Sequence, residues 1–206
     1  MSPLRASLAA FTVSLLVLST IPVLAERAGR TFKSPLNNFT VPVPDLSLFG
    51  SDVHVQKRNS KDEGFVSFVG DTGRRRRIDY ARLPPNANPL TSDEHHAGYE
   101  RILKRTIESN ARSAVIAQKP HEIEGVPMLL AVVLFPGASA LMDARTKEPS
   151  DSWRGLLFFI RGRFAYVLYA ELTDGGTELR KPPNAEELMK RAETILPEFY
   201  RTMAFK

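Results

Sequence analysis

The chain has 206 residues, 43% of them hydrophobic and 25% charged, and it contains no cysteine. Disulfide bonds, thiol catalysis and lipidation at a cysteine are therefore excluded, while the composition is that of a globular protein. The formal net charge of +5 favours anionic surfaces in general but identifies no partner.

The first 25 residues, Met1–Ala25, are typical of a secretory signal peptide. Arg5 supplies a positive charge, Leu8–Leu18 is an apolar core, and cleavage is expected after Ala25. The alternative is an uncleaved membrane anchor, although the apolar run is short for spanning a bilayer. We therefore expect residues 26–206 to form a single domain that is exported to the periplasm or secreted.

A short hairpin is expected at the start of the mature chain. It covers Arg30–Pro44, with Ser34–Asn38 as its turn. Pro42 and Pro44 cannot donate to a ladder, so the second arm is expected at a sheet edge. The triplet that begins at Asn38 is an N-glycosylation sequon, which matters only in a eukaryotic secretory pathway. A meander of three predicted strands follows, formed by Val53–Lys57, Phe65–Val69 and Arg74–Tyr80.

Two amphipathic helices are predicted. The first covers Thr91 to about Ser109, and Thr91 with Glu94 fits a capping box. The second begins after the N-cap Asn184 and extends to about Tyr200. Each carries an apolar stripe that one face of a sheet would cover. Pro197 interrupts the hydrogen-bond ladder of the second helix, so a kink or an early end is expected there.

The most apolar stretch is Trp153–Thr173, which predicts a long hairpin turning at Gly162. Its first arm is apolar at consecutive positions, so both of its faces should be covered and the pair should lie in the middle of a sheet. Two further strands are expected at Ala114–Glu124 and Pro127–Phe135. Together these patterns predict an α+β fold with a single antiparallel sheet of about six to eight strands packed between α-helices.

This order of elements resembles the PsbP/Mog1-like fold group. The resemblance is carried by FKSPLNNFTVPVP at residues 32–44, by LLFFIRGRFAYVLYAEL at residues 156–172, and by the final amphipathic helix ending in EFYRTMAF at residues 198–205. It covers most of residues 30–206 and implies an α/β/α sandwich. Members of this group are mainly accessory, binding or assembly proteins, so the resemblance implies such a role and supplies no catalytic residue.

The candidate contact site is the run of four arginines Arg74, Arg75, Arg76 and Arg77. On a strand, Arg75 and Arg77 would point to one face and Arg74 and Arg76 to the other. Guanidinium groups bind phosphates and carboxylates bidentately, which suits an anionic lipid, a polyanion or an acidic partner. The alternatives are a solvated edge strand protected against aggregation, which the pattern favours, and a convertase cleavage site, which is relevant only in a eukaryote. No aromatic residue interrupts the run, so nucleic acid is not favoured.

Other candidate chemistry has less support. His96 and Glu100 lie four residues apart on the first helix and could share a metal, but acidic first turns are favoured by the helix dipole in any case. Asp71 and Asp79 flank the arginines and are expected to form ion pairs rather than a catalytic pair. We therefore expect no metal and no other cofactor.

The function expected from these patterns is that of an exported, non-enzymatic binding, assembly or accessory protein of the bacterial cell envelope. Its partner would be an envelope protein that contacts the loops Leu83–Thr91 and Gly137–Ser152 as well as the arginine strand. One alternative is a basic face that binds anionic lipid or a polyanion. The other is a hydrolase whose site is not recognisable, because the sequence contains no nucleophile elbow, zinc-protease motif or phosphate loop.

Overall fold

The computed structural model describes residues 23–26 (backbone only), 30–46, 53–70, 74–84, 91–110, 112–139, 147–172 and 184–206. Its elements in chain order are β1 (Val23–Glu26), β2 (Thr31–Lys33), β3 (Phe39–Pro42), β4 (Val53–Asn59), β5 (Glu63–Val69), β6 (Arg75–Arg82), α2 (Ser92–Glu108), β7 (Ala114–Ile123), β8 (Val126–Phe135), β9 (Ser152–Arg161), β10 (Phe164–Glu171), α3 (Ala185–Arg201) and β11 (Ala204–Phe205). This order agrees with the predicted hairpins, meander and two helices.

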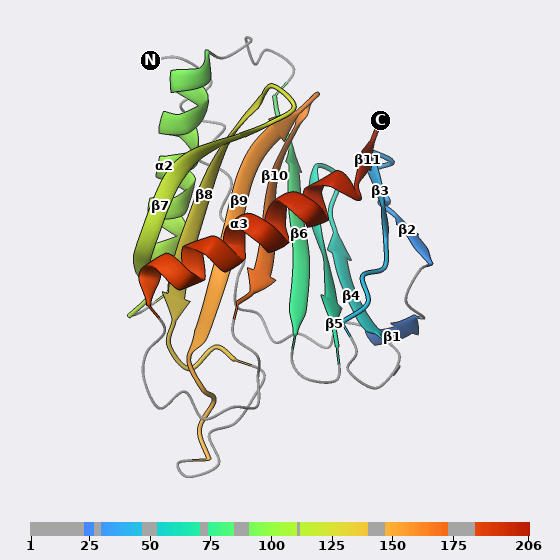
Figure 1. Ribbon diagram of the computed structural model, residues 1–206. Coiled ribbons are helices and arrows are strands. Elements are labelled where there is room, and N and C mark those ends of the chain that lie inside the picture. Colours follow the sequence, from blue (N-terminus) through green and yellow to red (C-terminus); the bar gives the residue numbers. More distant parts are fainter. Residues whose placement is uncertain are drawn as a thin grey trace.

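The main sheet has eight strands in the order β1-β4-β5-β6-β10-β9-β8-β7, and all described neighbours in it are antiparallel (Figure 1). The β9–β10 hairpin lies inside this sheet and turns at Gly162, whose φ of 58° is favourable for glycine. Leu156–Phe159 of β9 is buried at every position, so both faces of the strand are covered as predicted.

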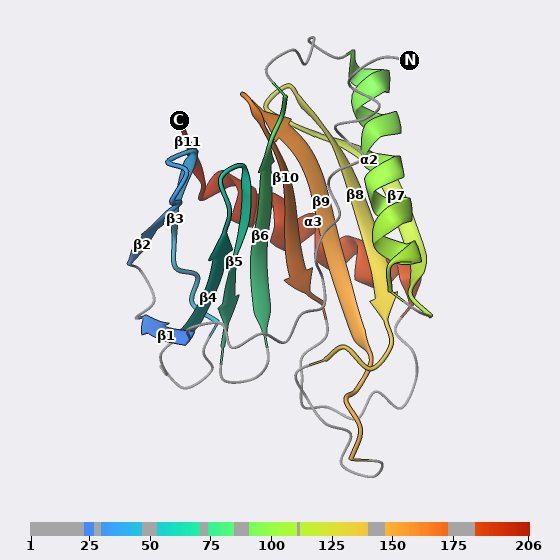
Figure 2. The same ribbon diagram turned by 180° about the vertical axis from the view of Figure 1, so that it is seen from behind.

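The two helices pack on opposite faces of the main sheet. In Figure 1, α3 crosses in front of the strands, and in Figure 2 α2 lies on the other side, over β7 and β8. The helix α3 contacts β7, β8, β9 and β10, whereas α2 packs mainly on β8 and β9 and at the edge on β7. The α+β class, with an antiparallel sheet between helices, is therefore confirmed.

Both helices begin at the capping residues that the sequence predicted. Thr91 and Glu94 form the predicted capping box, and the Asn184 side chain accepts a hydrogen bond from the Glu186 amide. The expected early end at Pro197 is wrong, because α3 continues through this residue to Arg201. Leu196, Pro197 and Phe199 are buried against the sheet, and this packing outweighs the missing backbone hydrogen bond.

A second, three-stranded sheet was not anticipated. Its order is β11-β3-β2, so β3 is its central strand and the predicted edge position of the second hairpin arm is wrong. The two-residue β11 pairs only with Thr40 and Phe39, and Pro42 lies beyond its reach opposite Thr31. The proline is tolerated in a central strand because no ladder amide is required of it there.

Two apolar clusters lie on the two faces of the main sheet. The larger one is on the α3 side and includes Phe39, Tyr80, Phe159, Tyr166 and Leu196, so that α3 and the small sheet share it. The smaller cluster, under α2, joins residues of that helix to alternate positions of β8, β9 and β10. The fold thus buries one face of the sheet along nearly its whole width and the other along about half of it.

Most of the predicted signal peptide lies outside the described residues. Residues 1–22 lie outside the described residues, and the expected cleavage after Ala25 falls within β1, which pairs with β4. Among the described helices, none combines the length and the apolar composition needed to cross a membrane.

Candidate binding face

The arginine run lies inside the main sheet rather than at its edge. Arg75–Arg77 begin β6, which is hydrogen-bonded to β5 on one side and to β10 on the other. The favoured interpretation of a solvated edge strand is therefore wrong. The register is fixed by Ile78 and Tyr80, which belong to the α3-side core and force the alternate residues to the α2 side.

This alternation confirms the predicted division of the arginines. Arg75 and Arg77 point to the α2 side of the sheet, Arg76 points to the α3 side, and Arg74 precedes the strand. We call the α2-side surface of β4, β5 and β6 the arginine face. Its residues are His54, Gln56, Arg58, Glu63, Phe65, Ser67, Val69, Arg75, Arg77, Asp79 and Ala81. In Figure 2, no described helix lies in front of these three strands.

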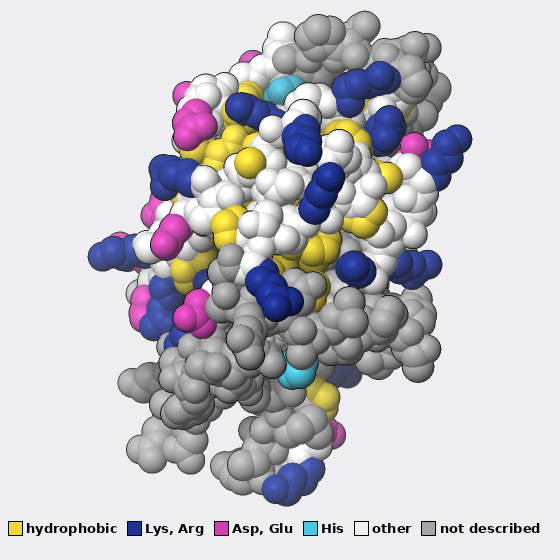
Figure 3. Space-filling model, turned by 90° about the vertical axis from the view of Figure 1, so that its right-hand side faces the viewer, with side chains coloured by type: hydrophobic (Ala, Val, Ile, Leu, Met, Phe, Trp, Pro, Cys, Tyr) yellow, Lys and Arg dark blue, Asp and Glu magenta, His cyan; other side chains and the backbone are white. Residues whose placement is uncertain are grey.

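The edge of the sheet next to this face is also basic. Figure 3 shows Lys and Arg side chains spread over that side of the molecule, with Asp and Glu mostly toward its left margin. Exposed cations of the described strands there include Lys33 and Arg58. The local charge therefore favours an anionic partner.

Arg77 and Asp79 form the first of two ion pairs on the α2 side. The Arg77 Nε donates to Asp79 Oδ1 at 2.5 Å, and the two side chains are 17% and 7% exposed. The Arg77 guanidinium stacks over the Phe65 ring at 4.0 Å. Burial raises the pKa of Asp79 although the attraction of Arg77 opposes this. The pair is structural, as expected for Asp79, and it holds Arg77 in one orientation.

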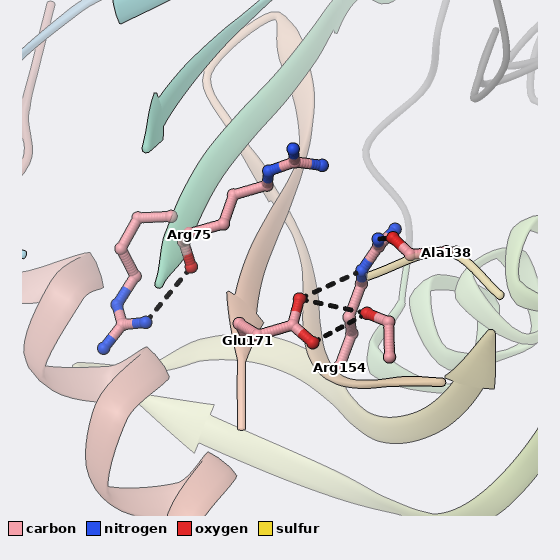
Figure 4. A network of polar contacts seen from close by, with 6 residues as sticks. Arg75, Ala138, Arg154 and Glu171 are labelled. Carbon is pink, nitrogen blue, oxygen red and sulfur yellow. Dashed lines mark hydrogen bonds and ion pairs between the residues drawn. The ribbon is translucent and has the colours of Figure 1, made fainter. Parts of the chain in front are cut away.

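Arg154 and Glu171 form the second pair, on β9 and β10 (Figure 4). The Arg154 Nε lies 3.4 Å from Glu171 Oε2, its Nη2 donates to the Ala138 carbonyl at 2.7 Å, and its guanidinium lies over the Phe135 ring. The Ser152 hydroxyl donates to Glu171 at 2.7 Å. Burial raises the pKa of Glu171, and the attraction of Arg154 only partly offsets this. Both carboxylate oxygens are occupied, so this group is poorly suited to proton transfer.

Arg75 lies between the two pairs without joining either. Burial and the charge of Arg154 lower the pKa of Arg75, which also interacts with Glu171 and Arg77. None of the other residues drawn in Figure 4 bonds to its guanidinium, and its backbone carbonyl accepts a hydrogen bond from Nη1 of Arg76. Among the described residues, Arg75 thus has no hydrogen-bond or ion-pair partner for its side chain.

Arg76 occupies a different environment on the α3 side. Burial and the neighbouring Arg74 lower the pKa of Arg76 to about 10, while Glu198 and Glu171 raise it. The guanidinium therefore stays protonated at neutral pH. The structure does not bring the four arginines together as one surface, because alternate residues face opposite sides of the sheet.

The remaining candidates are accounted for separately. Glu94 is engaged in the capping box, and His96 Nε2 lies 3.0 Å from the Met128 carbonyl. Within the described part of the chain, no group of three His, Asp or Glu side chains is arranged to hold a metal. Asp71 lies outside the described residues, as do 85–90 and 140–146 of the two loops expected to contact a partner.

Asn38 is not available for glycosylation in the folded protein. Its side chain donates to the Tyr166 hydroxyl at 3.0 Å and accepts from the Ser34 hydroxyl, and the residue is only 3% exposed. A glycan at this position would have to replace these buried contacts.

The sequence analysis missed Arg154, Ser152, Glu171 and Tyr169 as neighbours of the arginine run. A signal was present, because a hairpin that turns at Gly162 places Arg154 directly opposite Glu171. A charge in each arm of an otherwise apolar hairpin is typical of a cross-strand ion pair. The position of β6 beside β10 could not be obtained in this way, since a distant strand pairing leaves no local signal.

Two solved structures that are similar to this chain belong to the PsbP and Mog1 proteins. The chain is similar to cyanobacterial PsbP from Synechocystis, with a TM-score of 0.47 and 6% identity over 92% of this chain and 99% of the other. It is also similar to the Ran-binding protein Mog1p of Saccharomyces cerevisiae, with a TM-score of 0.45 and 9% identity over 87% and 96% of the two chains. No protein-family model matches the chain, and no curated protein matches its sequence. These similarities concern the fold alone.

Proposed function

We propose that this is an exported, non-enzymatic accessory protein of the bacterial cell envelope that binds an acidic segment of a protein partner through its arginine face. The observation that supports this most is the environment of Arg75. Its guanidinium is half-buried on an interior strand and has no side-chain partner among the described residues. An unpaired guanidinium can bind a carboxylate without giving up an existing ion pair, and its planar fork matches the two carboxylate oxygens.

The alternatives receive less support from the same surface. A lipid or polyanion binder would present several exposed cations together, whereas Arg77 is paired with Asp79 and Arg76 faces the other side. A hydrolase that used the carboxylates of this surface would need one free to exchange a proton, and Asp79 and Glu171 are both engaged by arginines.

Capture of the full chain from its own host tests this function. The wild-type protein, an Arg75→Glu variant and an Arg101→Glu variant would be isolated from envelope extract at physiological salt. The control, Arg101→Glu, makes the same charge change at an exposed position of α2. We expect a protein partner that Arg75→Glu loses and Arg101→Glu keeps. Equal retention by all three forms would contradict the proposal, and recovery of lipid alone would favour the lipid alternative.

Export is part of the proposal and has its own test. Mass spectrometry of protein recovered from the periplasm or medium should give Glu26 as the first residue. Cleavage there would remove Val23–Ala25 from β1 and leave β4 as an edge of the sheet. Recovery of the intact N-terminus from the cytoplasm would contradict export.

A further inference from the structure

The charges on the α2 side of the sheet do not balance. Arg75, Arg77 and Arg154 contribute three guanidinium groups, while Asp79 and Glu171 contribute two carboxylates. Each carboxylate is engaged by one arginine, so the excess charge resides on Arg75. Charges that are partly removed from water require a partner, and the described residues provide none for this group.

Two buried hydroxyls beside the arginines can still donate a hydrogen bond. Ser67 and Tyr169 are the direct cross-strand neighbours of Arg77, one on β5 and one on β10. Ser67 Oγ forms no hydrogen bond with a described residue, whereas the Tyr169 hydroxyl faces the Asp79 carboxylate without a well-aligned bond to it. Both hydroxyls are therefore donors that could support an acceptor bound among the arginines.

We infer that the arginine face contains an oxyanion site centred on Arg75, which binds one carboxylate or phosphate group. The guanidinium fork of Arg75 matches two oxygens of such a group. The inference rests on the proposed function only for the source of the oxyanion, which would be an acidic side chain of the partner.

The surroundings of Arg75 suit an anion and no cation. Arg77 is fixed by Asp79 and by the Phe65 ring, and Arg154 is fixed by Glu171 and the Ala138 carbonyl. Neither can turn away, so their positive potential stays directed at the site. Binding at Arg75 breaks no existing side-chain contact with a described residue, and the two flanking arginines are already held in place.

The site can be tested on the full chain without knowledge of the partner. The Nε–Hε signals of 15N-labelled arginines would be followed during titration with sodium acetate and, separately, with inorganic phosphate, both at an ionic strength held constant with chloride. We expect one signal to shift and saturate. An Arg75→Met variant should lack this signal and bind roughly tenfold more weakly or not at all, whereas Arg58→Met, on the same face, should keep the response.

Several outcomes would overturn the inference. These are equal, unsaturated shifts of all exposed arginines, which would indicate only screening, or a saturable response that persists in Arg75→Met. Thermal unfolding of the wild type provides a second readout, which does not depend on whether the variant folds. Acetate or phosphate should raise its melting temperature relative to chloride, and no rise with either anion would also overturn the inference.

The two anions distinguish the source, and the capture experiment distinguishes the two proposals. Tighter binding of acetate supports a protein carboxylate, and tighter binding of phosphate supports a phosphate source. If an anion saturates Arg75 but no partner is captured, the site stands and the proposed function fails. If capture depends on Arg75 but no anion binds, the proposed function stands and the oxyanion site is overturned.

Discussion

On the α3 side, apolar side chains cover the main sheet from β4 to β8, whereas on the α2 side the apolar cover extends only from β8 to β10. There the next strand, β6, carries Arg75, Arg77 and Asp79 in place of the hydrophobic residues that it turns to the other face. The same strand therefore contributes a core on one side and a half-buried charged surface on the other.

This difference shows what stabilises each face. Ile78 and Tyr80 are almost fully buried in the α3-side core, and they set the register of β6. Once this register is fixed, the arginines must lie on the sheet surface and find partners there. Two of the three guanidiniums on that side do so, and Arg75 does not.

The largest effect is expected from truncating the α3-side core. Phe159 is fully buried and stacks on Tyr166 at 4.9 Å, so Phe159→Ala should lower the unfolding free energy by about 3–5 kcal/mol. Phe65→Ala, on the half-buried arginine face, should lower it by only about 1–2 kcal/mol. Urea denaturation of both variants measures the difference. Similar losses would show that the two faces are equally part of the core.

A charge deletion on the α2 side should be nearly as damaging. Arg154→Met leaves the Glu171 carboxylate buried without its cation, and we expect a loss of about 3 kcal/mol at pH 7. Its control is Lys104→Met, which breaks an exposed pair with Glu108 and should change stability by less than about 1 kcal/mol. A small loss for Arg154→Met would mean that the pair contributes little.

The same variant should depend on pH in a defined direction. Burial already raises the pKa of Glu171 above its ordinary value of 4.5, and removal of Arg154 should raise it further. The native state then binds more protons than the unfolded state above about pH 4.5, so stability rises as the pH falls through the raised pKa. We therefore expect the difference between wild type and Arg154→Met to shrink from pH 7 to pH 5. A constant difference would argue against this origin.

Gly155 tests the tight approach of α3 to the sheet. A Cβ at this position would lie 2.9 Å from Leu196 Cδ1 and 3.1 Å from Ala192 Cβ. Gly155→Ala should therefore lower the unfolding free energy by about 1–3 kcal/mol. At Gly162 a Cβ meets no atom within 4 Å, and Gly162→Ala should cost about 1 kcal/mol through its positive φ alone. A harmless Gly155→Ala would show that α3 shifts easily on this face.

The smallest effect on stability is expected from Arg75→Met. Because this arginine lacks a side-chain partner among the described residues, its removal should leave the unfolding free energy unchanged or raise it by about 1 kcal/mol. Arg77→Met, two residues along the same strand, leaves Asp79 buried and unpaired and should lower it by about 3 kcal/mol. Equal losses in the two variants would indicate that Arg75 has a structural role.

Features that depend on neighbouring residues could be predicted from the sequence, whereas pairings between distant segments could not. The capping box at Thr91 and the turn at Gly162 depend on neighbouring residues, and both were predicted. The position of β6 beside β10 and the pairing of β11 with β3 join segments far apart in the chain, where periodicity has no information. The arginine run was therefore identified as a candidate but assigned to the wrong place in the sheet.

Site-specific photocrosslinking in the host cell envelope tests the central claim most directly. A photoreactive residue would replace Gln56 on the arginine face in one form of the protein. In another form it would replace Lys190, an exposed residue of α3. We predict a protein adduct from position 56 that disappears when Arg75→Glu is added, and none from position 190. An adduct from position 190 alone would contradict the account and move the binding surface to the opposite face of the sheet.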